Sequence, residues 1–135
     1  MANIVTAQVI TDGPRATFVK ILGIIDTSNV TNALVIDPAQ LSGMDNTGLV
    51  KAKHFRVQEI TYMVSGAMSV NLYWNALVPV PMVCISGSNT ADYEEFGGLT
   101  DTSGTDSDGK ITLSTTGWVG VQTFTIVLEL YKQET

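Results

Sequence analysis

The chain offers few side chains that could carry out acid–base or nucleophilic chemistry. It contains one histidine, His54, and one cysteine, Cys84. A catalytic histidine works with a nucleophile and an orienting acid, and no G-x-S-x-G sequence or comparable signature accompanies His54. Cys84 lies in the apolar run 81–85 with no basic neighbour to stabilise a thiolate, so we expect a small buried hydrophobic residue. We therefore predict no catalytic residue and no enzyme activity.

Carboxylates and hydroxyl groups of the kind that bind calcium are concentrated in one segment, residues 101–109. No glutamate closes this segment at the spacing of an EF-hand, and a single cysteine excludes a zinc site built from several cysteines. The acidic residues also lack the apolar surroundings that separate the roles of glycosidase carboxylates. We predict no metal site and no cofactor, with a weak cation site in this segment as the alternative.

A small group of basic and aromatic residues could contact another molecule. Lys51, Lys53 and Arg56 cluster at the start of an expected strand. They either dock against an acidic neighbour or are simply solvated. Tyr73 and Trp74 are adjacent and therefore point to opposite faces of a strand. One of the two is expected in the core, and the other is available to a sugar or a protein. These five residues are the candidate contact residues.

The elements that must position these residues are β-strands. Apolar and polar residues alternate with a period of two along 55–64, 68–74 and 123–130, which places one set on the core side of a sheet. Threonine, valine and isoleucine are abundant and favour strands. The only hint of a helix is a single turn at 38–41.

Turn-forming residues separate the expected strands at short intervals. Asp12-Gly13-Pro14 precedes a strand over 16–25, and Ser65-Gly66 predicts a hairpin between 60–64 and 68–74. Asp108-Gly109 predicts a tight turn before 111–114. Pro79 and Pro81 make 77–85 an edge strand or a bulged one. The pattern predicts a single all-β domain over 1–135, an antiparallel β-sandwich that is jelly-roll-like, with about eight short strands and little or no helix.

Charge is scarce and unevenly placed along the chain. Hydrophobic residues make up 44% and charged residues 15% of the sequence, which excludes disorder. The net charge of −6 disfavours binding to a nucleic-acid backbone. Most of the negative excess falls within 92–110, which we expect to be an exposed, mobile loop. The spans 60–91 and 111–128 carry no charge at all, which indicates central strands or a face covered by another subunit.

Nothing in the sequence resembles a targeting or membrane segment. The first residues lack the basic region and the apolar run of a signal peptide. The span 60–91 is interrupted by polar residues and prolines, whereas a membrane helix needs about 20 predominantly apolar residues. We expect a soluble protein synthesised in a reducing cytosol, with neither a membrane nor a nucleic acid as partner.

Several short strings, in order along nearly the whole chain, resemble small virion structural proteins of tailed bacteriophages. They are Asp12–Arg15, Val19–Ser28, Val35–Pro38, Val70–Asn75, Phe96–Leu99, Gly109–Gly117 and Thr123–Lys132. The resemblance implies a capsid decoration or cement protein, a β-rich homotrimer that binds the major capsid protein on the outside of a phage head. It also implies that the protein resides in the virion after synthesis in the host cytoplasm. It transfers no binding residue to this chain.

The alternatives are a tail or neck component of the virion and a binding module for carbohydrate or a host surface. A binding module would use Tyr73 or Trp74 together with the acidic loop. In the favoured interpretation the five candidate contact residues meet the capsid or a sister subunit, and uncharged strands stay dry because other copies cover them.

Overall fold

The structure is a computed structural model that describes residues 3–13, 15–26, 28–31, 33–38, 41, 54–66, 68–76, 79–93, 95, 97–100 and 109–133. Ten strands and no α-helix occur within these residues. The strands are β1 (Ile4–Asp12), β2 (Ala16–Ile25), β3 (Ala33–Ile36), β4 (His54–Val64), β5 (Ser69–Trp74), β6 (Val80–Ile85), β7 (Ser88–Asp92), β8 (Leu99–Thr100), β9 (Ile111–Thr116) and β10 (Gln122–Gln133).

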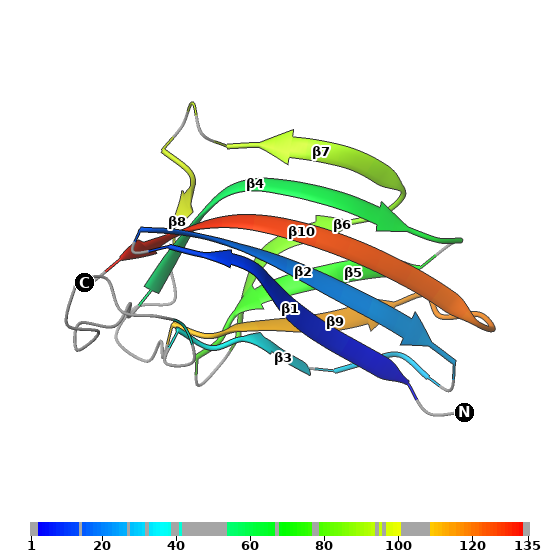
Figure 1. The fold of residues 1–135 in the computed structure, drawn as a ribbon. Coiled ribbons are helices and arrows are strands. Elements are labelled where there is room, and N and C mark those ends of the chain that lie inside the picture. Colours follow the sequence, from blue (N-terminus) through cyan, green and yellow to red (C-terminus); the bar gives the residue numbers. More distant parts are fainter. Residues whose placement is uncertain are drawn as a thin grey trace.

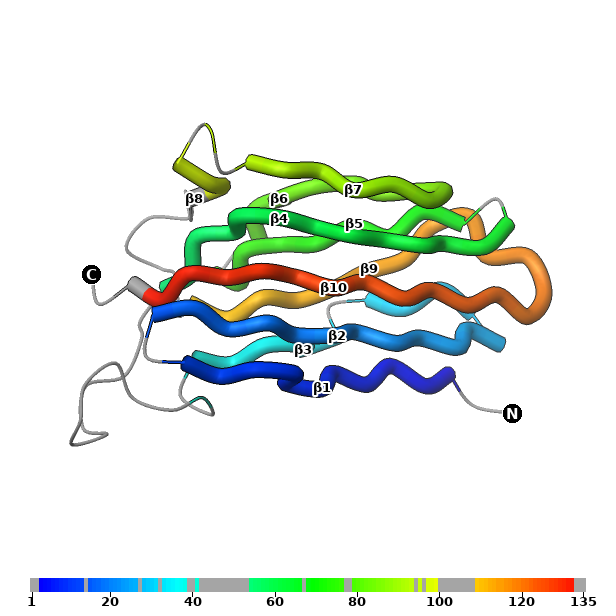
Figure 2. The backbone as a smooth tube through the Cα atoms, turned by 45° about the horizontal axis from the view of Figure 1, so that its top comes forward, coloured from blue at the N-terminus to red at the C-terminus, as the bar shows by residue number. Residues whose placement is uncertain are grey.

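The strands form two antiparallel sheets that pack face to face (Figures 1 and 2). Sheet A has the order β1-β2-β10-β4-β7, and the two-residue β8 also pairs with β4. Sheet B has the order β3-β9-β5-β6. Most connections cross from one sheet to the other, whereas β5 and β6 are consecutive neighbours within sheet B. The predicted all-β antiparallel sandwich is confirmed.

One hydrophobic core fills the space between the sheets. Trp74, Phe55 and Phe124 are its largest fully buried side chains. Gly23 in β2 makes room for one of them, because a Cβ atom there would lie 2.2 Å from the ring of Phe124. A glycine in the middle of a strand is therefore explained by close packing rather than by a turn.

A β-bulge at Gln58 changes which residues of β4 face the core. The pairing of β4 with β10 shifts by one residue between Glu129 and Leu130, and Gln58 is the extra, 4% exposed residue. Phe55 and Val57 point inward before the bulge, and the fully buried Ile60 does so after it. The strict alternation predicted across 55–64 is therefore wrong beyond Val57.

The hairpin predicted at Ser65-Gly66 is also wrong. The two strands that flank it, β4 and β5, belong to different sheets. The connection is anchored to β10 instead, since the Ser65 amide donates to the carbonyl of Thr123 at 3.0 Å. Gly66 has a φ of 65°, which suits a tight change of direction without a side chain.

Two other local predictions are confirmed. β6 is an edge strand of sheet B, and its register with β5 shifts between Leu72 and Tyr73. A hydrogen bond from the Leu41 amide to the Pro38 carbonyl at 3.3 Å agrees with the single turn expected at 38–41, of which the structure describes only the two end residues.

Candidate functional site

The described strands of sheet B contain no charged residue. The uncharged span 60–91 supplies β5 and β6, and the uncharged span 111–128 supplies β9. β3, with the sequence Ala-Leu-Val-Ile, completes the sheet. Segments that are far apart in the sequence are therefore brought together in one charge-free layer (Figure 1).

The outward side of sheet B is the candidate site, and we call it the neutral face. Val70, Leu72 and Trp74 of β5 are buried in the core, so the residues between them point away from it. By the same alternation and the strand register, the neutral face consists of Leu34, Ser69, Asn71, Tyr73, Pro81, Cys84, Thr112, Ser114 and Thr116.

The register shows that the neutral face is continuous across the sheet. One row crosses all four strands, because Thr112 lies opposite both Leu34 and Tyr73, and Tyr73 lies opposite Pro81. The next row runs from Ser114 through Asn71 to Cys84. Hydroxyl, amide and apolar groups therefore alternate over an extended surface. Another protein could cover this surface without burying an unpaired charge.

Thr112 stands out within the neutral face. It is only 4% exposed, and its Oγ1 has no hydrogen-bond partner among the described residues. A buried hydroxyl without a partner destabilises the fold. Leu34, opposite it on β3, is by contrast 55% exposed.

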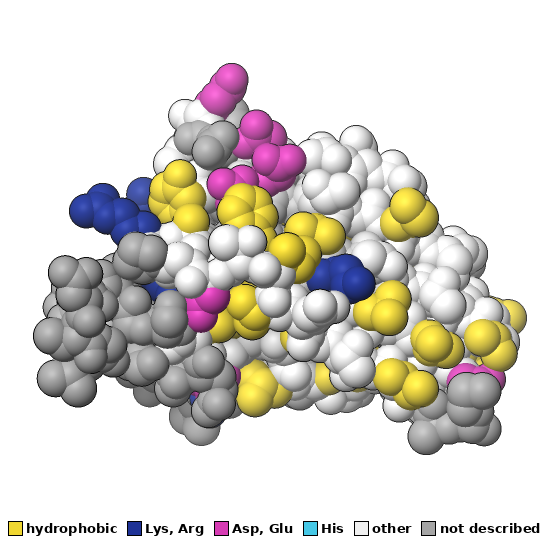
Figure 3. Space-filling view, viewed as in Figure 1, with side chains coloured by type: hydrophobic (Ala, Val, Ile, Leu, Met, Phe, Trp, Pro, Cys, Tyr) yellow, Lys and Arg dark blue, Asp and Glu magenta, His cyan; other side chains and the backbone are white. Residues whose placement is uncertain are grey.

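The outward side of sheet A carries charge on part of its surface, whereas the part formed by Thr61, Met63, Thr90 and Thr125 is uncharged, and we call this side the charged face. It carries Lys20, Arg56, Glu59, Asp92 and Glu129, placed there by the strand register. Figure 3 shows acidic side chains gathered near β7 and β8 and a basic side chain near the middle of this view.

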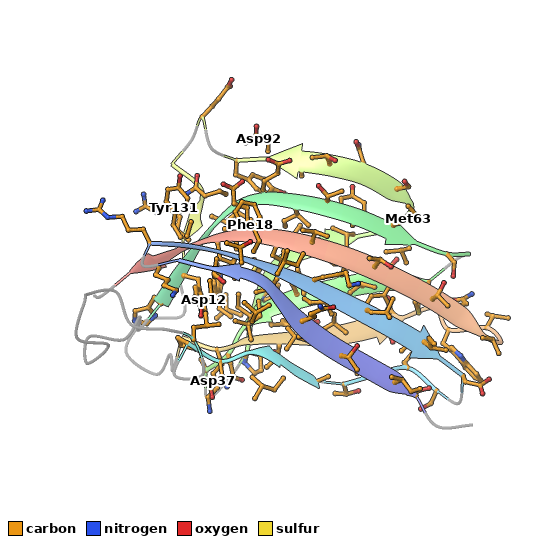
Figure 4. All side chains as sticks on the ribbon, in the orientation of Figure 1. Asp12, Phe18, Asp37, Met63, Asp92 and Tyr131 are labelled. Carbon is orange, nitrogen blue, oxygen red and sulfur yellow. The ribbon has the colours of Figure 1, made fainter. Side chains whose placement is uncertain are left out.

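Three carboxylates of the charged face lie in one row across adjacent strands. Glu129 is directly opposite Glu59, and Glu59 is directly opposite Asp92. Phe18 of β2 extends the row, because it lies opposite Glu129 on the side away from Glu59. Figure 4 labels both Phe18 and Asp92 on sheet A. Phe18, Glu59 and Glu129 help to line a shallow hollow of about 80 Å³. Among the described residues, no group of three or more histidine, cysteine or acidic side chains could hold a metal ion.

The structure separates the predicted contact residues instead of gathering them. Arg56 lies on the charged face opposite Tyr131, whereas Tyr73 is half-buried on the neutral face. Trp74 is 2% exposed and belongs to the core, so its selection as a contact residue is wrong. Lys51 and Lys53 lie outside the described residues.

The remaining predictions about single residues had mixed outcomes. The expectation that Cys84 is buried is wrong, since it is exposed on the outward side of edge strand β6. His54, which has no catalytic signature in the sequence, is the first residue of β4. Trp118 packs against the core and donates from Nε1 to the Ile25 carbonyl at 3.2 Å. Within the loop predicted over 92–110, Leu99 and Thr100 instead form β8, which pairs with β4. Residues 101–108 lie outside the described residues, so mobility and cation binding there remain predictions.

Comparison with known proteins gives no family for this chain: no family model, no curated protein and no solved structure matches it. Within the described residues, no helix has the length and apolar character needed to cross a membrane.

Sequence reasoning did not single out the most prominent members of the neutral face. Asn71, Ser114 and Leu34 carry no chemical signature of their own. The signal that pointed to them was the lack of charge over 60–91 and 111–128. It became a site only when the strand order placed those spans side by side.

Proposed function

We propose that the protein is a virion structural protein that assembles through the neutral face. The observation that carries this proposal is the absence of charge across the described strands of sheet B. A surface exposed to water normally carries charged residues, whereas the centre of a protein interface is depleted of them. A sister subunit or a capsid protein would keep this face dry.

The strand pairing supports a finer assignment of the sandwich as a jelly roll. β2 pairs with β10, β3 with β9, β4 with β7 and β5 with β6. Four antiparallel pairs wound across two sheets are the connectivity of two interlocked Greek keys, an architecture found in viral capsid proteins and also in lectins. Because one fold serves many functions, the proposed virion role rests on the neutral face and on the resemblance of the sequence as well as on the fold.

The specific role that we propose is capsid decoration. Three copies form a homotrimer that binds the outside of a phage head through the major capsid protein and reinforces the shell, with no enzyme activity and no cofactor. A trimer that engages three equivalent capsid sites gains avidity, so each single contact needs only modest strength. The protein would reach the capsid surface after synthesis in the host cytoplasm.

Charge placed on the neutral face tests this proposal. Ser114→Lys and Asn71→Lys each add a cation to the centre of the neutral face, and Thr125→Lys adds the same charge to a half-buried position on the charged face. Burying an unpaired charge costs several kcal/mol, so the first two variants should weaken trimer formation by about 100-fold or more. Native mass spectrometry and capsid co-sedimentation measure both steps, and Thr125→Lys should behave like the wild type.

A wild-type protein that stays monomeric at all concentrations and does not bind phage heads would overturn the proposal. Electron microscopy of labelled virions would distinguish the head position from a tail or neck position.

The outward position of Tyr73 favours one competing function, a carbohydrate or host-surface binding module. Tyr73 lies between Thr112 and Pro81 on the neutral face, where a ring could stack on a sugar. Trp74 cannot join it, because it lies in the core. A glycan array that compares the wild type with Tyr73→Ala tests this alternative, and a signal lost in the variant would favour it.

A further inference from the structure

The outer edge of β1 is the longest of the four sheet edges, although β1 also has a shifted register, between Val9 and Thr11, and ends at Asp12. The other three edge strands are shorter: β6 has six residues and contains Pro81, β7 has five residues and β3 has four. β1 has nine residues, and residues 3–11 include neither a proline nor a charged side chain. Proteins usually protect such edges with charges, prolines or short strands, because a free edge presents unpaired backbone groups to any extended chain.

Apolar side chains are exposed along this edge. The exposed fractions are 44% for Ile4, 45% for Val9 and 53% for Ile10. Val9 lies opposite Val19 of the core and therefore faces inward, whereas Ile4 lies opposite Ile24 on the outward side. Both faces of β1 thus expose apolar surface in the single chain. Such surface is typical of a site where another molecule binds.

An apolar groove opens beside the inward side of β1. It has a volume of about 270 Å³ and lies between β1 and β3, which Figure 2 shows next to each other at one side of the sandwich. Ala7 and Val9 line it from sheet A, and Leu34 and Ile36 line it from sheet B. A strand added to β1 would cover the mouth of this groove with its own inward side chains.

The order of side chains along β1 identifies that added strand. Residues 4–10 read Ile-Val-Thr-Ala-Gln-Val-Ile, which is nearly the same in both directions about Ala7. In an antiparallel pair related by a two-fold axis at Ala7, Val5 lies opposite Val9, and Thr6 lies opposite Gln8. Each apolar inward residue then meets an apolar residue, and the small Ala7 meets itself on the axis. Cross-strand pairs of β-branched residues stabilise a sheet.

We propose that β1 pairs antiparallel with β1 of a second copy of this chain, about a two-fold axis at Ala7. Sheet A then continues without a break from one copy into the other. The pairing rests on residues 5–9, because the register of β1 with β2 shifts between Val9 and Thr11. This contact shares only Leu34 with the neutral face and lies at a different edge of the sandwich, so it would join neighbouring oligomers into a larger array.

The pairing should depend on concentration. One strand edge with its flanking groove is small beside a standard interface of about 1,600 Å², so a single contact is weak. Within an array of oligomers, the same contact is reinforced because several edges engage together.

Cysteine cross-linking tests both the pairing and its register, in a Cys84→Ser background. In an antiparallel pair, directly opposite Cα atoms are about 4.5–5.5 Å apart, which is within disulfide reach. Ala7→Cys should therefore form an intermolecular disulfide at least about tenfold faster than Thr6→Cys, whose copy lies on a diagonal about 7–8 Å away. The double variant Thr6→Cys/Gln8→Cys should recover the fast rate.

Thr90→Cys on β7, the opposite edge of sheet A, is the matched control and should react slowly. Equal rates for Ala7→Cys, Thr6→Cys and Thr90→Cys would overturn the proposal. Adding Ser114→Lys to the Ala7→Cys protein tests the two contacts separately. The disulfide between β1 strands should still form, although assembly through the neutral face is lost. A fast cross-link in a protein that forms no trimer would support the β1 pairing and contradict the proposed function.

A proline scan gives a second measurement that does not depend on thiol chemistry. Successive residues of an edge strand direct their N–H groups alternately to the neighbouring strand and to solvent. One of Thr6→Pro and Ala7→Pro therefore removes a donor needed only by the added strand. That variant should keep the higher melting temperature of the two and should lose the concentration-dependent increase in mass by sedimentation equilibrium. Unchanged self-association in both variants would contradict the pairing.

Discussion

The charged face of sheet A and the neutral face of sheet B are built from the same kind of strand but differ in what they present to their surroundings. Lys20, Glu59 and Glu129 stand on the first, and the described strands of the second contain no charge. Core packing does not require this difference, because both sheets bury the same kinds of apolar residue. Charge on an outer face instead reflects whether that face meets water or another protein.

The largest effect that sharpens this comparison concerns Lys132, a charged residue of sheet A whose side chain points inward. Lys132 is buried, and its Nζ contacts Asp12 Oδ1 at 2.5 Å and the Gly13 carbonyl at 2.7 Å. Lys132→Met leaves both groups without this donor and should lower the free energy of unfolding by about 3 kcal/mol. Urea unfolding at a fixed protein concentration measures the loss.

Lys20→Met is the matched control on the charged face, and it should change the free energy of unfolding by less than about 0.5 kcal/mol. A similar loss in both variants would show that the inward Lys132 and the outward Lys20 contribute equally to the free energy of unfolding.

Features of the fold that neighbouring residues determine could be predicted from the sequence, whereas features that depend on residues far along the chain could not. The ends of β2 were predicted to the residue because Asp12-Gly13-Pro14 and the residues after Ile25 set them locally. The bulge at Gln58 and the crossing at Ser65-Gly66 could not be predicted, since both depend on β10, which lies more than fifty residues away. The neutral face was foreseen only as uncharged sequence, because its rows exist only once the strand order is known.

The second prediction compares two buried threonines of β9. Thr112 and Thr115 are 4% and 3% exposed, but only Thr112 lacks a hydroxyl partner among the described residues. Thr115 Oγ1 accepts a hydrogen bond from the Val30 amide at 2.8 Å. Thr112→Val should therefore stabilise the protein by about 1 kcal/mol, and Thr115→Val should destabilise it by about 1 kcal/mol.

Thermal unfolding of the two variants measures these changes, and the sign is the decisive result. Loss of stability in Thr112→Val comparable to that in Thr115→Val would mean that the Thr112 hydroxyl has a stabilising partner. The buried hydroxyl of the neutral face would then have a hydrogen-bond partner in the single chain that the described contacts do not include.

The smallest effect concerns the carboxylate row of the charged face. Glu59 lies between Glu129 and Asp92, directly opposite both, and like charges in such positions repel. Glu59→Gln removes the middle charge and keeps the shape of the side chain, so it should raise the free energy of unfolding by about 0.5 kcal/mol at low salt. Salt screens repulsion between exposed charges, so the gain should shrink as ionic strength rises. Thr61→Ser, at the next outward position of β4, should show no such salt dependence. A gain in the free energy of unfolding that is independent of salt would mean that charge repulsion between these carboxylates does not destabilise the protein.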